Sequence, residues 1–222
     1  AEIQRFEPPE PVSPPSAPAG VAQDPTRWLL DCVDGVAALA RIPTTSTGEP
    51  LSTDGVLETV RPVFRRLETF AAMAFLLVDE DGLEFTIAAC EPEAQRAALQ
   101  REVDAQVASG TFAWAVYQNR PVVVPARELG HVVLWHAIGT RTKTLGMFLG
   151  AVDPSLSFVP DSVQKLISIA LMFCGNAIES AALYHEIHAH SKKLEVTVAE
   201  RTRQLQEAKD QALAASHAKG EF

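Results

Sequence analysis

The stretch DSVQKLISIALMFCGNAIES, residues 161–180, decides how this chain is organised. Asp161 is followed three residues later by Gln164, which is the arrangement of a helix-capping box. Apolar residues then recur at spacings of three and four, which predicts a helix with one buried face. No proline or glycine cap follows Ala181, so we expect the helix to run on. The apolar stripe consists of Val163, Leu166, Ile167, Ala170, Leu171, Phe173, Ala177 and Ile178.

The segments before this helix combine helical and extended patterns. Amphipathic helices are expected from Asp24 and from residue 53 or 54, because apolar residues recur there at helical spacing. Short apolar runs bounded by glycine, proline and acidic turns predict strands. This order of elements predicts an α+β fold, with a mostly antiparallel sheet and helices packed on one face. The expected strands span residues 71–78, 83–90, 121–125, 131–138 and 145–152, and helices at 92–108 and 111–118 separate the second strand from the third.

Beyond residue 182 the sequence carries a seven-residue repeat. Over about 40 residues, this repeat predicts a parallel two-stranded coiled coil and hence a homodimer formed through the C-terminal helix. The seam is weak, because Ser191 and Arg201 are polar and alanines fill its end. A weak seam suits a signalling helix, since two registers can lie close in energy, and a single solvated helix is the alternative. The repeat consists of Tyr184, Ile187, Ser191, Leu194, Val198, Arg201, Leu205, Ala208, Ala212 and Ala215.

These patterns divide the chain into three parts. Residues 1–23 contain six prolines, which exclude a helix or an inner strand and predict a linker. A motif for a proline-binding module is the alternative. Residues 24–182 are expected to form one globular domain, and residues 183–222 the helical rod.

Three stretches of the expected domain resemble the GAF family of sensory domains. GTFAWAVYQNRPVVVP, residues 110–125, is similar to that family's short helix, basic-proline turn and strand. TLGMFLGA, residues 144–151, resembles its glycine-containing last strand, and NAIESAALY, residues 176–184, resembles its usual ending. The resemblance covers residues 24–186 and implies a GAF-like fold with a sensory or regulatory role.

The C-terminal part resembles the linker that precedes the dimerisation helix of sensor histidine kinases. VAERTRQL, residues 198–205, and AKGEF, residues 218–222, carry this similarity. It implies a parent protein that uses ATP and magnesium to phosphorylate a histidine and passes the phosphoryl group to a response regulator. The histidine box of that family is absent from these 222 residues, so we expect them to catalyse nothing and to hold no cofactor.

The resemblance also implies a ligand pocket between the sheet and the loops that cover it. We expect a small-molecule ligand there. Its identity is not indicated, because the residue patterns that GAF domains use for cyclic nucleotides and bilins are absent. Haem ligation by His131 or His136 is a further hypothesis, beside ordinary core packing of both rings. The expected pocket is lined by Cys90, Trp114, Arg127, His131 and Trp135.

The three cysteines, Cys32, Cys90 and Cys174, allow an enzymatic alternative. Some GAF proteins reduce free methionine sulfoxide with pocket thiols, and such thiols need an exposed setting that lowers their pKa. Two of the three fall on apolar helix faces and Cys90 ends a strand, so buried structural cysteines are favoured. A third hypothesis is a dimerisation spacer that binds no ligand.

The motif HEIHAH, residues 185–190, has the residue types of a metal site without the spacing. A zinc-protease helix needs its second histidine four residues after the first, and Ala189 stands there. We therefore predict a solvated helix surface and no metal site.

Composition limits the partners. The net charge of −9 opposes nucleic-acid binding and docking on an anionic membrane. Hydrophobic residues make up 47% and charged residues 21%, the balance of a globular protein. The longest apolar run, residues 166–182, is interrupted by polar side chains, which predicts no membrane contact. The few unpatterned cysteines favour a reducing cytoplasmic location.

Overall fold

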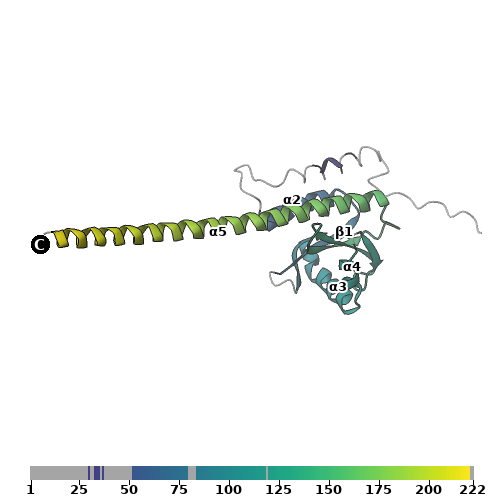
Figure 1. Cartoon of the computed structure of the whole chain (residues 1–222). Helices are drawn as coiled ribbons and strands as arrows, with labels where there is room; N and C mark the ends of the chain where they lie inside the picture. Colours follow the sequence, from purple (N-terminus) through teal and green to yellow (C-terminus); the bar gives the residue numbers. More distant parts are fainter. Residues whose placement is uncertain are drawn as a thin grey trace, which may run out of the picture.

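The computed structural model describes residues 30, 33–35, 37, 52–79, 84–118 and 120–220, with side chains described as far as residue 211. Its centre is a five-stranded antiparallel sheet in the order β2-β1-β5-β4-β3 (Figure 1). The last strand, β5, pairs with the first strand, β1, and this pairing joins the β1–β2 hairpin to the β4–β5 hairpin in one sheet. The strands are β1 (Phe70–Val78), β2 (Phe85–Glu91), β3 (Val122–Pro125), β4 (Val132–Gly139) and β5 (Thr144–Val152).

Helices cover both faces of this sheet. Helices α2 and α5 lie on one face, and α3 and α4 lie on the other (Figure 1). The α+β class, the antiparallel sheet and the helical extension are confirmed, whereas the helices were expected on a single face. The reason is that β4 buries Leu134 and Ile138 toward α5 and buries Val133 and Trp135 toward α4. The helices are α2 (Thr53–Arg65), α3 (Arg96–Ala108) after the short 3₁₀ turn η2 (Glu93–Gln95), α4 (Thr111–Val116) and α5 (Asp161–Gly220).

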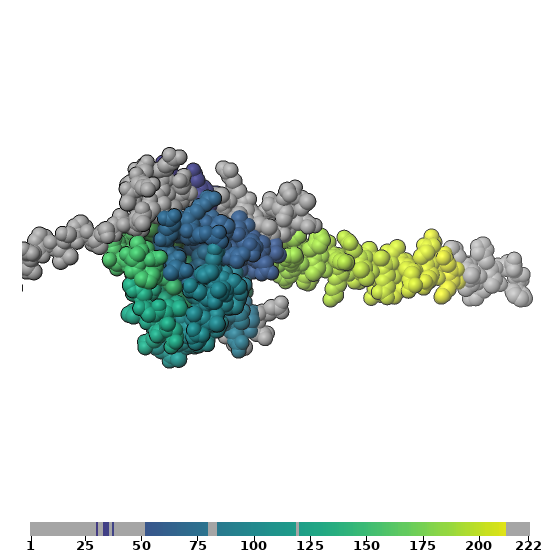
Figure 2. Space-filling model, turned by 180° about the vertical axis from the view of Figure 1, so that it is seen from behind, coloured from purple at the N-terminus to yellow at the C-terminus, as the bar shows by residue number. Residues whose placement is uncertain are grey.

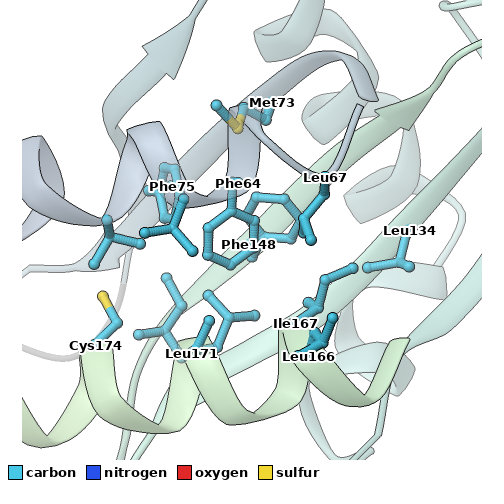
Figure 3. Close-up of a cluster of buried hydrophobic side chains, with 14 of the residues drawn as sticks. Phe64, Leu67, Met73, Phe75, Leu134, Phe148, Leu166, Ile167, Leu171 and Cys174 are labelled. Carbon is cyan, nitrogen blue, oxygen red and sulfur yellow. The ribbon is translucent and has the colours of Figure 1, made fainter. Parts of the chain in front are cut away.

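Aromatic rings dominate the core between the sheet and helices α2 and α5. The rings of Phe64 and Phe148 lie 4.7 Å apart, and Phe75 lies 5.4 Å from the first and 5.2 Å from the second. Such pairs add about 0.5–1.5 kcal/mol each beyond the area that they bury. Helix α5 closes the cluster with Ile167 and Leu171, as Figure 3 shows.

Local sequence sets where the helices begin. The Ser52 hydroxyl accepts a hydrogen bond from the Gly55 amide at 3.2 Å, which caps α2 and confirms its predicted start. At the start of α5 the predicted capping box does not form. The Gln164 side chain donates to the Val159 carbonyl at 2.9 Å, so it ties the helix to the preceding loop.

Helix α5 is one unbroken helix of 60 residues. Its inner face is buried as far as Ala181, and every side chain from Ala182 to Gln211 is exposed. Residues 182–220 therefore form a rod of roughly 60 Å, and Figures 1 and 2 show it projecting from the domain. The prediction that the chain does not fold back after the domain is confirmed.

One described helix is long and apolar enough to be compared with a membrane span. Within Asp161–Gln211 of α5, an 18-residue stretch has a mean hydropathy of 1.7, and 44% of that stretch is buried inside the protein. Core packing of α5 against the sheet accounts for the buried part of this stretch.

Some predicted features lie outside the described residues. They include the linker at residues 1–23, Cys32 and residues 221–222. Of the helix expected from Asp24, only residues 30, 33–35 and 37 are described, and these are helical.

The first prediction concerns the close approach of α5 to the β4–β5 hairpin. A Cβ atom on Gly175 would stand 2.5 Å from the Gly139 carbonyl oxygen, which is backbone and cannot turn aside. We expect Gly175→Ala to lower the free energy of unfolding by about 2 kcal/mol, because overpacking outweighs the gain in helix propensity.

The measurement is urea denaturation at pH 7. Ala182→Gly on the exposed part of the same helix is the control, because it reports helix propensity without a steric contribution and should cost about 1 kcal/mol. A stabilising Gly175→Ala would show that propensity wins and that the contact is loose.

Candidate functional site

The structure distributes the five predicted pocket residues over four parts of the chain. Within residues 52–79, 84–118 and 120–211, no hydrogen bond, ion pair or ring contact joins any two of them. That these five residues line one pocket therefore stays a prediction from the sequence. Cys90 is the last residue but one of β2, Trp114 lies on α4, Arg127 and His131 lie in the β3–β4 loop, and Trp135 lies on β4.

Trp135 is the member of this set that points to a ligand. Its side chain is fully buried, and the ring of Phe112 stands edge-on to it at 5.3 Å. Its Nε1–H has no hydrogen-bond partner among the described residues. A buried donor without an acceptor costs about 1–3 kcal/mol, which an incoming acceptor atom would recover.

A mostly apolar hollow of about 610 Å³ lies beside this tryptophan. Phe112 belongs to its lining and contacts both Trp135 and Phe85, so its ring connects the hollow to the packing around the buried indole. The volume lies within the usual range of small-molecule sites. None of the five predicted residues lines it. The lining comes from β2, α3 and α4: Glu84, Phe85, Gln100, Val103, Asp104, Val107, Phe112, Ala113, Val116 and Tyr117.

A buried carboxylate holds the loop beside this region. Glu102 accepts hydrogen bonds from the backbone amides of Arg127, Glu128 and Leu129 at 2.9, 2.6 and 3.2 Å, and from Gln106 Nε2 at 2.7 Å. Burial alone would raise the pKa of Glu102, but the bonds from Gln106 and the three amides outweigh it and lower that pKa. The charged carboxylate thus holds the β3–β4 loop against α3. We call this set of hydrogen bonds the Glu102 clasp.

The two predicted pocket residues in the β3–β4 loop, Arg127 and His131, have different contacts. Arg127 contributes its backbone amide to the clasp, and its side chain is exposed. His131 is half-buried, with Nε2 3.5 Å from the Leu156 carbonyl oxygen, a distance too long for a strong hydrogen bond. A sequence signal for the clasp exists, because Glu102 and Gln106 share the buried face of α3 with apolar side chains.

The thiol of Cys90 is held in an unreactive state. It donates to Glu93 Oε2 at 3.2 Å, and the same carboxylate pairs with Arg96. Burial, followed by this hydrogen bond, raises the pKa of Cys90 to about 11, against the opposing charge of Arg96. The thiol is therefore protonated at neutral pH, unlike the thiolates that attack sulfoxides or disulfides.

The second described cysteine cannot cooperate with the first. Cys174 lies on α5 in the core of one sheet face, and Cys90 lies in the core of the other. Burial raises the pKa of Cys174 to about 12. Reduction of a sulfoxide by thiols consumes two of them and leaves a disulfide, so this pair does not favour the enzymatic alternative.

A histidine links the sheet to the long helix. His136 on β4 points to the face opposite Trp135, with Nε2 3.0 Å from Ser168 Oγ and Nδ1 2.8 Å from the Ala137 carbonyl oxygen. The Ser168 hydroxyl also lies 3.0 Å from the Gln164 carbonyl, to which it donates.

These three contacts need three protons, because both carbonyls only accept, whereas a neutral imidazole and one hydroxyl supply two. Burial lowers the pKa of His136, against the Ala137 carbonyl, and so favours the neutral ring. One of these three contacts is therefore left without a proton at neutral pH.

The rod carries the predicted seam on its surface. Ile187, Leu194, Val198 and Leu205 are each 63–71% exposed. Arg201 and Ala208 are exposed as well, and Ala212 lies in the part of the helix whose side chains are not described.

The histidines at the start of the rod are also exposed, and the ring of His188 stacks on Tyr184 at 5.6 Å. No group of three or more His, Cys, Asp or Glu side chains in the described part of the chain is arranged to hold a metal ion.

No protein-family model matches this chain, and no curated protein matches it in sequence. Solved structures of GAF proteins are similar to it at low identity. The GAF domain/HD domain protein from Geobacter sulfurreducens has a TM-score of 0.46 and 15% identity, over 59% of this chain and 94% of that one. A putative GAF sensor protein from Burkholderia vietnamiensis has a TM-score of 0.46 and 11% identity, over 71% and 94%.

An enzyme is among the similar structures as well. Free methionine-R-sulfoxide reductase from Neisseria meningitidis, in complex with its substrate, has a TM-score of 0.37 and 12% identity, over 76% of this chain and 96% of that one. Because all three TM-scores are below 0.5, these likenesses carry no argument about function. The GAF assignment stays an interpretation of the sequence.

The second prediction concerns the Glu102 clasp. We expect Glu102→Gln to lower the free energy of unfolding by about 2 kcal/mol or more at pH 7, because charge-assisted bonds to three amides are lost. The folded-state pKa is lowered, so the stabilisation is complete above the ordinary carboxyl pKa and disappears as pH falls through the folded value.

Denaturation curves of the unchanged chain and of Glu102→Gln between pH 7 and pH 3 measure the difference in their free energies of unfolding. This difference should stay constant at first and become smaller below about pH 4.5. Asp104→Asn, an exposed acid on the same helix, is the matched control and should show little change. A difference in free energy of unfolding that grows on acidification would contradict a stabilising role of the charged Glu102 carboxylate.

Proposed function

We propose that this chain is the sensory or regulatory input unit of a larger cytoplasmic signalling protein. The state of the domain passes through α5 into a parallel homodimeric rod, and the rod controls an effector. We infer that the effector is a histidine kinase, which uses ATP and magnesium and serves a response regulator. The resemblance of residues 194–222 to the kinase linker supports this choice.

The observation that carries the proposal is that one helix belongs to both parts. The inner face of α5 packs on the sheet, and the same helix continues as a rod whose large apolar side chains are exposed. Ile187, Leu194 and Leu205 would gain little from remaining in water, whereas pairing with a second rod buries them. This consideration favours the dimer over a single solvated helix.

A sensor is favoured over a simple spacer by the other face of the sheet. A hollow beside a buried indole N–H that lacks an acceptor is a feature that a spacer does not need. The expected ligand is a small molecule with an apolar body and an acceptor atom. Native mass spectrometry of freshly purified protein tests this distinction, because a spacer would carry no bound small molecule.

The third prediction tests the rod. We expect Leu194→Asp to shift the chain from dimer to monomer, because a carboxylate in the seam is desolvated opposite its own copy. Val196→Asp is the matched control. It is an apolar-to-acid change at a residue that is 62% exposed, and at about 100° per residue it points away from the seam.

Light scattering gives the mass, and circular dichroism shows whether the domain stays folded. An unchanged dimer in Leu194→Asp would remove the rod seam as the interface. Equal loss of dimer in both variants would indicate that helix charge, and not the seam, is responsible.

The fourth prediction tests the effector. In a chimera that joins residue 222 to a histidine kinase core, one alanine inserted after Ala199 rotates the downstream helix by about 100° and should change the autophosphorylation rate. A duplication of residues 193–199 restores the heptad phase and should leave the rate close to that of the parent chimera. If both insertions behave as the parent does, the rod does not carry the signal to a kinase.

A further inference from the structure

The hollow formed by β2, α3 and α4 combines buried apolar residues with exposed acidic ones. Val103 and Phe112 belong to its lining and are only 3% and 6% exposed. Glu84, just before β2, and Asp104, on α3, belong to the same lining and are exposed. None of the ten described residues that line it is a lysine, an arginine or a histidine. The lining therefore carries two negative charges and no positive charge.

Neither carboxylate is neutralised by a neighbouring cation. In the part of the chain that the structure describes, no ion pair involves Glu84 or Asp104. Asp104 Oδ1 accepts a hydrogen bond from Gln100 Nε2 at 2.9 Å, which orients this carboxylate. Its second oxygen bonds to no described residue. Both acids are thus open to a donor that comes from outside the chain.

Large apolar and aromatic side chains are exposed beside these acids. Val107 is 53% exposed and Tyr117 is 84% exposed, and both line the hollow. Phe85 and Phe112 add two further rings, whose centres lie 4.9 Å apart. An aromatic ring attracts a cation over its face, and its apolar surface gains from leaving water. The hollow therefore offers aromatic surface and free carboxylates to the same ligand.

This combination discriminates between classes of ligand. An anion would meet two like charges and no basic side chain to hold it. A neutral apolar molecule would cover the rings but give the carboxylates nothing that water does not give them. An organic cation satisfies both, because its apolar body covers the rings while its charge pairs with the carboxylates. The net charge of −9 adds a long-range attraction for cations.

We propose that the hollow binds an organic cation, with an apolar and preferably aromatic body and a protonated amine directed to Glu84 and Asp104. This inference rests on the proposed function, in which a small molecule binds here, and it adds the charge of that molecule. Because Trp135 is fully buried and the two carboxylates are exposed, the acceptor atom and the amine of the ligand belong to different ends of the molecule.

The test uses three probes that share one ring system: naphthylmethylamine, a cation at pH 7, naphthylmethanol, which is neutral, and naphthoate, an anion. Isothermal titration calorimetry of the full chain measures their affinities at low and at high salt. We expect the amine to bind at least about tenfold more tightly than the alcohol at low salt, and the anion to bind most weakly. The advantage of the amine should shrink at high salt, because salt screens exposed charges.

Two double variants of equal net charge identify the carboxylates. Glu84→Gln combined with Asp104→Asn should remove most of the advantage of the amine and leave the affinity for the alcohol unchanged. Glu195→Gln combined with Glu200→Gln, on the exposed rod, is the matched control and should leave all three affinities unchanged. Ala113→Trp, at an exposed position of the lining, fills the hollow and should abolish the binding of every probe.

Equal affinities for the three probes would overturn the inference of a cation and leave the sensory function standing, because the hollow would still bind a small molecule. Amine binding that survives in the Glu84 and Asp104 double variant, or in Ala113→Trp, would place the amine elsewhere and overturn the inference as well. Failure of every probe to bind would also overturn it. The proposed function fails separately, when native mass spectrometry finds no small molecule on freshly purified protein.

Discussion

The contact between α5 and the sheet is the constraint on which the remaining structure depends. At Gly175 the helix backbone meets the backbone of Gly139, and one and two turns earlier Leu171 and Ile167 pack in the cluster that contains the phenylalanines. A helix held this closely cannot slide or roll without disturbing the sheet. The same helix continues without a break into the rod, so the domain and the rod share one continuous backbone.

Strand β4 connects this contact to the other face of the sheet. Neighbouring residues of a strand point to opposite faces, so Trp135 faces the α3–α4 side while His136 faces α5. Each carries a polar group that is not fully satisfied: an indole N–H without an acceptor, and an imidazole in a chain of bonds that lacks one proton. One strand therefore carries a buried N–H without an acceptor on the α3–α4 face and a proton-deficient hydrogen-bond chain on the α5 face.

The sequence was informative wherever a pattern is local. The periodicity of residues 161–180 predicted α5, and apolar runs between turn residues predicted β1 and β5 to within one residue at each end. A continuous apolar run such as residues 132–135 shows that a strand is buried but not what covers each face. For that reason the helices expected at 92–108 and 111–118 were not assigned to the second face.

The candidate site depends on contacts between distant segments, which no local pattern reports. The hollow is formed by β2, α3 and α4, and the clasp joins Glu102 to amides about 25 residues later in the chain. Backbone amides have no sequence signature, so the place of Glu102 among the apolar side chains of α3 could indicate a buried carboxylate but not its partners.

Burial of a polar group is tolerated only when something compensates for it. Glu102 is compensated in full by its hydrogen bonds, whereas the Trp135 N–H is not. Under the proposed function, this difference would distinguish a structural group from one that meets a ligand. An acceptor that reached Trp135 would have to displace the Phe112 ring, which packs on α4 and on β2. The free energy gained at the indole would then favour a different packing of β4, and the neighbouring residue His136 would carry that change to Ser168 on α5.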